Sequence, residues 1–249
     1  MDLNKFSIIF SSSDIAGRNI ARMIAEAGYG QALCELPENI LYKKFDDNSG
    51  PYIVLSRHSS EKKIRAITCH FTGNWSGEAK YGGNPRDVCI AMPSVMKGVA
   101  QYISGKINTL TGYVFTLEVT HHGPTGNFPM MFVEIGSCEE DWGNTQAAGI
   151  IADALLNAKE SEDGEVVIGV GGPHYAPDFT RLLDKYRIAH IIPQYAVDGL
   201  ALETFRMGIE RSTERVEKVL IAWKGLTAAQ REKIIGFCNE CDIGYIKYK

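Results

Sequence analysis

Several patterns that mark other classes of protein are missing from this sequence of 249 residues. No apolar run approaches the roughly 20 residues that a membrane-spanning helix needs. Basic residues do not prevail, since 26 lysines and arginines stand against 30 acidic residues and the net charge is −4. This balance argues against a generally basic nucleic-acid coat, although a local basic patch would still bind RNA. No secretory signal precedes the first predicted strand, so we expect a cytoplasmic protein.

The short signatures of several enzyme classes are absent as well. No G-x-S-x-G motif occurs, which disfavours a serine hydrolase, and no H-E-x-x-H motif marks a zinc peptidase. Cysteine is sparse, with six scattered residues that we expect to be free thiols in a reducing compartment. Cys238 and Cys241 form a lone C-x-x-C without a second pair, and we interpret them as helix packing.

What the sequence does contain is a regular alternation of strand and helix patterns. Residues 31–50 look polar and irregular, and residues 71–85 form a long Gly/Asn-rich loop with exposed aromatics. We find no internal repeat or linker, so we expect one domain over 1–249 with an α/β/α layered, mixed and mostly parallel sheet. Strands are predicted at 6–10, 51–56, 64–69, 112–119, 129–134, 166–170, 188–192, 219–223 and 243–248, and helices at 15–27, 92–103, 141–157, 178–186, 198–206 and 227–239.

One stretch, residues 118–126, organises the rest of the chain. A strand of aromatic and β-branched residues leads into His121 and His122, and Gly123-Pro124 then ends regular backbone. The next strand ends at Glu134. Two imidazoles and a carboxylate therefore lie where strands stop, which is where α/β proteins commonly place their chemistry.

Most of the histidines also lie where predicted strands end. Five of them lie at or just past the carboxyl end of a predicted strand: His58, His70, His121, His122 and His174. In open α/β sheets ligands bind outside these ends, so the five share one rim if their strands run parallel. His190 lies at the start of a predicted strand, and we expect it to be structural.

Histidines and carboxylates at such a rim support two kinds of chemistry. They bind zinc with one position left for water, or they act without metal as general acids and bases. Neighbouring strand residues point to opposite faces, so His121 and His122 both reach one ion only if the chain turns at His122. The expected zinc ligands come from His70, His121, His122, His174 and Glu134, and the expected catalytic residues are His121, His122, His174 and Glu134.

Three segments carry a resemblance to a known family: Thr120-His121-His122-Gly123-Pro124-Thr125, Glu134-Ile135-Gly136-Ser137 with Trp142, and Gly171-Gly172-Pro173-His174-Tyr175. With the N-terminal Ser-Ser-x-Asp-x-Ala and residues 69–74, they resemble the archaeal and plant type of D-aminoacyl-tRNA deacylase across nearly the whole chain. Pro173 departs from the glycine expected there in some members.

The resemblance implies a phosphorylase/hydrolase-like fold, a zinc requirement, and hydrolysis of the ester between a D-amino acid and the 3′ end of tRNA. It also predicts a preference for D- over L-substrates with tolerance of many side chains. Separately, we expect a monomer with no membrane association. Trp75 or Tyr175 would stack on the terminal bases. The expected substrate-binding residues are Ser12, Asn74, Gly123, Thr125, Gly171, Gly172 and Tyr175, with backbone N–H groups of Gly123, Gly171 or Gly172 at the oxyanion. Candidates for phosphate contacts are Lys43, Lys44, Lys62, Lys63, Arg65, Arg181, Lys185 and Arg187.

Two other classes remain open at this point. A zinc peptidase or amidohydrolase on a similar fold would act strongly on a dipeptide and weakly on charged tRNA. A non-enzymatic RNA-binding module would bind tRNA without turnover, but the paired histidines and the acidic net charge argue against it.

Overall fold

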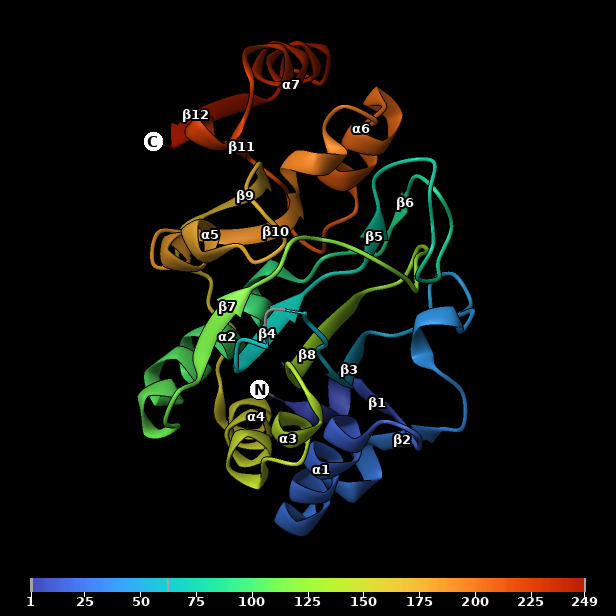
Figure 1. Cartoon of the computed structure of the whole chain (residues 1–249). Helices are drawn as coiled ribbons and strands as arrows, with labels where there is room; N and C mark the ends of the chain where they lie inside the picture. Colours follow the sequence, from blue (N-terminus) through green and yellow to red (C-terminus); the bar gives the residue numbers. More distant parts are fainter. Residues whose placement is uncertain (1, 62, 249) are drawn as a thin grey trace.

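The computed structural model describes residues 2–61 and 63–248, and Figure 1 shows the arrangement of its helices and strands. The larger sheet has six strands, of which the first four in spatial order are parallel and the last two run the opposite way. In order, they are β2 (Leu33–Leu36), β1 (Ser7–Ser11), β3 (Tyr52–Arg57), β8 (Met130–Gly136), β4 (Ala66–His70) and β7 (Val114–Leu117).

A second sheet of four parallel strands follows from the C-terminal part of the chain, in the order β10 (Tyr186–Ile192), β9 (Glu165–Val170), β11 (Lys218–Ala222) and β12 (Gly244–Tyr248). Two short strands, β5 (Gly73–Asn74) and β6 (Asp87–Val88), pair with each other in the loop region. The sheets are mixed and mostly parallel with helices on both sides, which confirms the predicted α/β fold class.

The helices follow from local sequence signals. In α1 (Ile15–Ile24) the N-cap is Asp14, whose carboxylate accepts a 2.9 Å hydrogen bond from the amide of Gly17. In α7 (Ala228–Glu240) Thr227 and Gln230 form a capping box. The remaining helices are α2 (Pro93–Lys106), α3 (Glu139–Trp142), α4 (Thr145–Asn157), α5 (Pro177–Leu182) and α6 (Leu202–Glu210).

The two sheets are joined at the segment that follows β7. The amide of Val119 donates to the carbonyl of His174 at 3.0 Å, and the amide of Thr120 donates to that of Ile191 at 2.8 Å. Helix α2 also packs against strands of both sheets, since it contacts β4, β7 and β10. The stretch around 118–126 therefore connects the two halves, and this brings the loop after β9 next to the end of β7.

The structure corrects three local predictions. Residues 31–50 are not all irregular, because β2 pairs in parallel with β1 there. Trp75 is only 3% exposed, and its indole N–H donates to the carbonyl of Thr120 at 3.0 Å, so it anchors the loop. His190 lies well inside β10 rather than at its start.

Within the described residues, no helix is long and apolar enough to cross a membrane.

Candidate active site

The site is built on one face of the larger sheet, around the central strand β8. In the sheet register Glu134 lies opposite Ser56 of β3 and Thr68 of β4, so these three side chains share a face. His58 follows Ser56 by two residues, and His70 follows Thr68 by two. β3 and β4 run in opposite directions. His58 therefore lies beside Glu134 on the side of the C-terminal end of β8, and His70 lies on the side of its N-terminal end. The condition for a single rim, that all these strands run parallel, is not met because β4 is antiparallel to β8, and the histidines gather over a sheet face instead.

The chain does turn at His122, which the neighbouring His121 and His122 need if both are to reach one metal ion. His122 has a φ of 45°, in the left-handed region, and lies in a bend of the backbone after β7. The ring centroids of His121 and His122 consequently lie 4.3 Å and 4.8 Å from that of His70. Adjacent histidines thus face the same partner. We call His58, His70, His121, His122 and His174, together with Glu118 and Glu134, the histidine cluster.

Backbone carbonyls orient three of these rings. The Nδ1 atoms of His70, His121 and His122 lie 3.1, 2.8 and 2.6 Å from the carbonyl oxygens of Phe71, Val119 and Gly123. A carbonyl only accepts, so each Nδ1 carries the hydrogen, and in the neutral ring Nε2 keeps the lone pair. Metal-binding histidines commonly use this arrangement, in which the second nitrogen is fixed by a carbonyl.

Two buried carboxylates tie the cluster together, and the sequence reasoning named only one as a site residue. Glu118 Oε1 lies 3.0 Å from His58 Nδ1, and Glu118 Oε2 lies 2.9 Å from His174 Nε2. Glu134 Oε2 lies 3.5 Å from His58 Nδ1 and 3.7 Å from His70 Nε2. The missed signal was the position of Glu118, three residues before His121 on the same extended segment.

The histidine cluster contains charged groups, such as His58 and Glu134, and neutral groups, such as His121 and His122. Burial opposes the charged form of His58, but Glu118 and Glu134 outweigh it and raise its pKa to about 11. Burial likewise opposes ionisation of Glu134, yet His58 and His70 bring its pKa down to about 2. His122 differs, because burial and the neighbouring His70 lower its pKa to about 4. Burial and the other histidines also hold the pKa of His121 well below its usual range.

The residues fit a cation such as zinc. One ligand atom from each of His70, His121 and His122 lies within 4.8 Å of the others, and the same holds for His58, Glu118 and His174. Buried His70 Nε2 makes no well-aligned hydrogen bond in the described part of the chain, and the nearest carboxylate oxygen, Glu134 Oε2, is 3.7 Å away. A buried polar atom without a partner is costly unless another group binds it. Imidazole nitrogen and carboxylate oxygen are zinc ligands.

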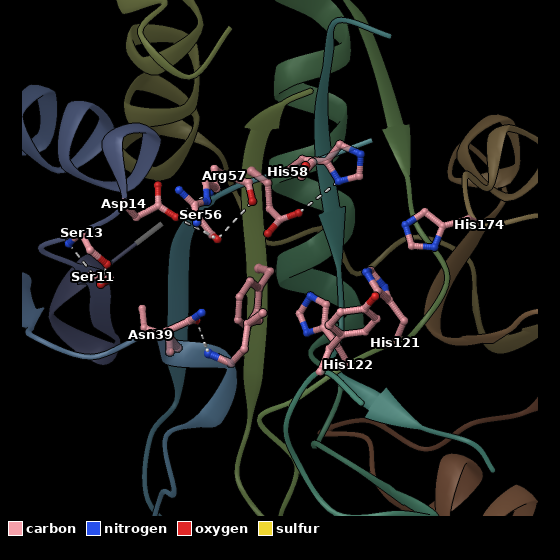
Figure 2. A pocket seen from close by; sticks show the side chains of 16 residues that line it. Ser11, Ser13, Asp14, Asn39, Ser56, Arg57, His58, His121, His122 and His174 are labelled. Atoms are coloured by element: carbon pink, nitrogen blue, oxygen red, sulfur yellow. Dashed lines mark hydrogen bonds and ion pairs between the residues drawn. The ribbon is translucent and has the colours of Figure 1, made fainter. Parts of the chain in front are cut away.

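Two hollows meet at the cluster and share Tyr81, His121, His122 and His174. We call the first the serine-side hollow: it has a volume of about 420 Å³, and its far wall includes Ser11, Ser13, Asp14, Ser56 and Arg57. Figure 2 shows Ser11, Ser13 and Asp14 across this hollow from His121, His122 and His174. The second, the tyrosine-side hollow, has a volume of about 490 Å³, and its walls include Trp75, Tyr195 and Ala196.

Several predicted substrate-binding residues serve the scaffold. The amide of Gly123 donates to the carbonyl of Tyr81 at 3.0 Å and that of Gly171 to Ile192 at 2.8 Å, so neither is free for an oxyanion. The hydroxyl of Tyr175 lies 2.8 Å from His58 Nε2, and its ring lines a separate apolar hollow. Asn74 lines the tyrosine-side hollow, but its amide donates to the carbonyls of Gly82 and Asn84. The others, Ser12, Thr125 and Gly172, line neither hollow.

The predicted phosphate-binding residues that the structure describes also line neither hollow. Arg65, Arg181 and Arg187 are paired with acidic residues, and Lys43 is paired with Glu38. Lys44, Lys63 and Lys185 have no such pair among the described residues, and Lys62 lies outside them. The basic residues that do line a hollow are Arg57, which lies over the ring of Trp142, and Lys80. Sequence reasoning missed both, since neither belongs to a cluster of basic residues.

Comparison with known proteins identifies the family of this chain. The family model described as D-aminoacyl-tRNA deacylase matches residues 45–246. A D-aminoacyl-tRNA deacylase of Ignicoccus hospitalis is 37% identical over 93% of this chain and 94% of its own length. That of Pyrococcus furiosus is 40% identical over 78% of this chain and 72% of its own length. One of Methanococcus maripaludis is 33% identical over 96% and 98%.

A solved structure has the same fold. A crystal structure titled as a conserved protein of unknown function superposes with a TM-score of 0.85 at 27% identity, covering 96% of this chain and 94% of the other. The family match spans every element that contributes to the histidine cluster, from β3 to the loop after β9. The chain therefore belongs to the D-aminoacyl-tRNA deacylase family.

Proposed function

We propose that this chain hydrolyses the ester bond of D-aminoacyl-tRNA, releasing a free D-amino acid and tRNA. The observation that carries the proposal is the position of the histidine cluster in a chain of this family: it lies where two hollows meet. An aminoacyl-tRNA end needs such a layout, because a nucleoside lies on one side of the scissile ester and an amino acid on the other. The nearby imidazoles and carboxylates supply groups that activate water and move protons.

Zinc belongs to this proposal as the expected metal. His70, His121 and His122 would hold it, because their Nδ1–H groups are fixed by carbonyls and Nε2 is the remaining ligand atom. The lowered pKa values of His121 and His122 favour the neutral rings that metal binding requires. At His70 burial opposes the charged form, but Glu134 outweighs it and raises the pKa, so zinc binding there would release a proton. A bound zinc ion would lower the pKa of water and polarise the ester carbonyl.

The chain's own groups then handle the protons. His174 has a side chain that is 42% exposed, and its Nε2 lies 2.9 Å from the buried carboxylate of Glu118. A carboxylate in this position holds an imidazole in a fixed orientation, as general acid–base catalysis requires. We therefore assign His174 to proton transfer between water and the leaving 3′-oxygen. His58, charged because of its raised pKa, compensates the buried charges of Glu118 and Glu134.

The decisive experiment is a pair of initial rates on D-Tyr-tRNA and L-Tyr-tRNA at one salt concentration. We expect rapid release of D-tyrosine and much slower release of L-tyrosine. Equal rates, or a preference for the L-form, would remove this assignment. A dipeptide substrate included in the same assay would then show whether a zinc peptidase activity takes its place.

A further inference from the structure

The two hollows differ in chemistry, although they meet at the same histidines. The serine-side hollow presents hydroxyls of Ser11, Ser13 and Ser56 and the carboxylate of Asp14. These are acceptors that suit an α-ammonium group. The tyrosine-side hollow is more apolar, since Trp75, Pro193, Ala196 and Gly199 line it beside a polar edge of Asn74, Ser76, Glu78 and Lys80. A purine ring needs apolar surface against its faces, and this hollow provides it.

Two exposed tyrosines stand at the tyrosine-side hollow. Tyr81 is 66% exposed and Tyr195 is 60% exposed, which makes them the two most exposed of the large apolar side chains in the described residues. They come from segments far apart in sequence: Tyr81 lies in the loop after β5, and Tyr195 lies in the 3-10 helix Gln194–Ala196 after β10. Two unrelated segments thus place a large exposed ring beside the same histidines.

The backbone under each ring is fixed, whereas the ring itself is available. The carbonyl of Tyr81 accepts from the amide of Gly123 at 3.0 Å, and the amide of Gln194 donates to the carbonyl of Gly172 at 3.0 Å. Neither tyrosine hydroxyl makes a hydrogen bond within the part of the chain that the structure describes. Trp75 forms a rigid floor, since it is buried and its indole is bonded to Thr120. Rings on fixed backbone bind a base with little loss of conformational entropy.

We propose that the tyrosine-side hollow binds the terminal adenosine of tRNA, with Tyr81 and Tyr195 stacking on the adenine. The ester then lies at His121, His122 and His174, and the aminoacyl group enters the serine-side hollow. This inference rests on the proposed function, because it fixes the direction in which that substrate crosses the site. The base-stacking role moves from Trp75 and Tyr175, which are buried or bonded elsewhere, to two residues that are exposed at the site.

The test measures binding rather than hydrolysis. Two deacylated tRNAs are compared at one salt concentration, identical except that one ends in CCA and the other lacks the final adenosine. Stacking on an aromatic side chain strengthens binding by roughly 5- to 160-fold per base. We expect wild-type protein to bind the complete tRNA more tightly by a factor in this range. Tyr195→Ala and Tyr81→Ala should each reduce that ratio, and Tyr195→Phe should preserve it.

Tyr29→Ala is the matched control, because Tyr29 is also exposed, at 41%, but lines neither hollow. It should leave the ratio unchanged, and all variants should keep the thermal midpoint because the rings are exposed. The proposal is overturned if wild-type protein binds both tRNAs equally, or if Tyr195→Ala weakens both to the same extent. Either result leaves the D- and L-Tyr-tRNA rates untouched, so the two proposals fail separately.

Discussion

His122 and His190 have the same ionisation behaviour and opposite surroundings. Burial is the first cause of the lowered pKa at both, and both pKa values fall to about 4. His190 uses both ring nitrogens: Nδ1 lies 3.1 Å from Thr120 Oγ1, and Nε2 lies 3.0 Å from the carbonyl oxygen of Cys89. His122 uses only Nδ1, on the carbonyl of Gly123. A neutral buried histidine is therefore not itself a sign of function, whereas a nitrogen without a partner at a hollow is one.

Metal removal is expected to separate these two histidines most strongly. Wild-type protein should carry zinc, lose its deacylase activity with a chelator and regain it when zinc is added. Metal content, measured by mass spectrometry, should fall in His122→Ala and stay at the wild-type level in His190→Gln, which keeps a donor and an acceptor. Full activity in rigorously metal-free protein would leave the histidines as acids and bases only.

The next largest expected effect is on the rate of turnover, which should depend on His122 and on His174. We expect His122→Ala and His174→Ala to lower the initial rate on D-Tyr-tRNA by about a hundredfold or more, as loss of a ligand or general base does. Both rings line the hollows, so the thermal midpoint of each metal-free variant should remain near that of metal-free wild type. If activity and stability decline in proportion in both variants, the histidine cluster is structural and the site lies elsewhere.

The free energy of unfolding should instead depend more on His190 than on His122. His190→Ala removes a fully buried ring that contacts Phe71 and Trp75 edge-on, and it leaves the hydroxyl of Thr120 and the carbonyl of Cys89 without this partner. A cavity and unpaired polar groups together should lower the free energy of unfolding by about 3 kcal/mol. Urea denaturation measures this value. A loss as small as that of Tyr29→Ala would contradict a structural role.

The pH dependence of folding provides the smallest and most specific effect. The pKa of His190 is about 4 in the folded protein, against an ordinary value of 6.5. Below pH 6.5 the unfolded chain therefore binds a proton that the folded protein does not, and stability falls as the pH falls. Between pH 6.5 and 5 this contribution is about 2 kcal/mol. Denaturation of wild type and His190→Gln at both pH values should show a smaller loss in the variant; equal losses would mean that His190 is not neutral when folded.

The local sequence determined much of the scaffold, because short-range physics decides it. Asp14 caps α1 and the Thr227/Gln230 pair caps α7, since side-chain acceptors satisfy free amides at helix starts wherever such sequences occur. Alternation of strand and helix patterns predicted the α/β class. Gly123-Pro124 after two histidines indicated a turn, and His122 does adopt a left-handed conformation there. β2 was missed because its strand is short and half-exposed, with little hydrophobic signal.

Tertiary structure alone decided how the chemical groups meet. The sequence of one strand does not determine the direction in which it pairs. Because β4 pairs antiparallel with β8, His70 lies over the sheet face and not at the predicted rim. Glu118 became a central residue only because the segment after β7 pairs with the loop after β9, which brings His174 to its carboxylate. The sequence already separated His122, before Gly123-Pro124, from His190 in an apolar strand, and long-range contacts then left His122 Nε2 open while both nitrogens of His190 gained partners. The sequence supplied the imidazoles and carboxylates, and non-local pairing determined which of their atoms remained without partners.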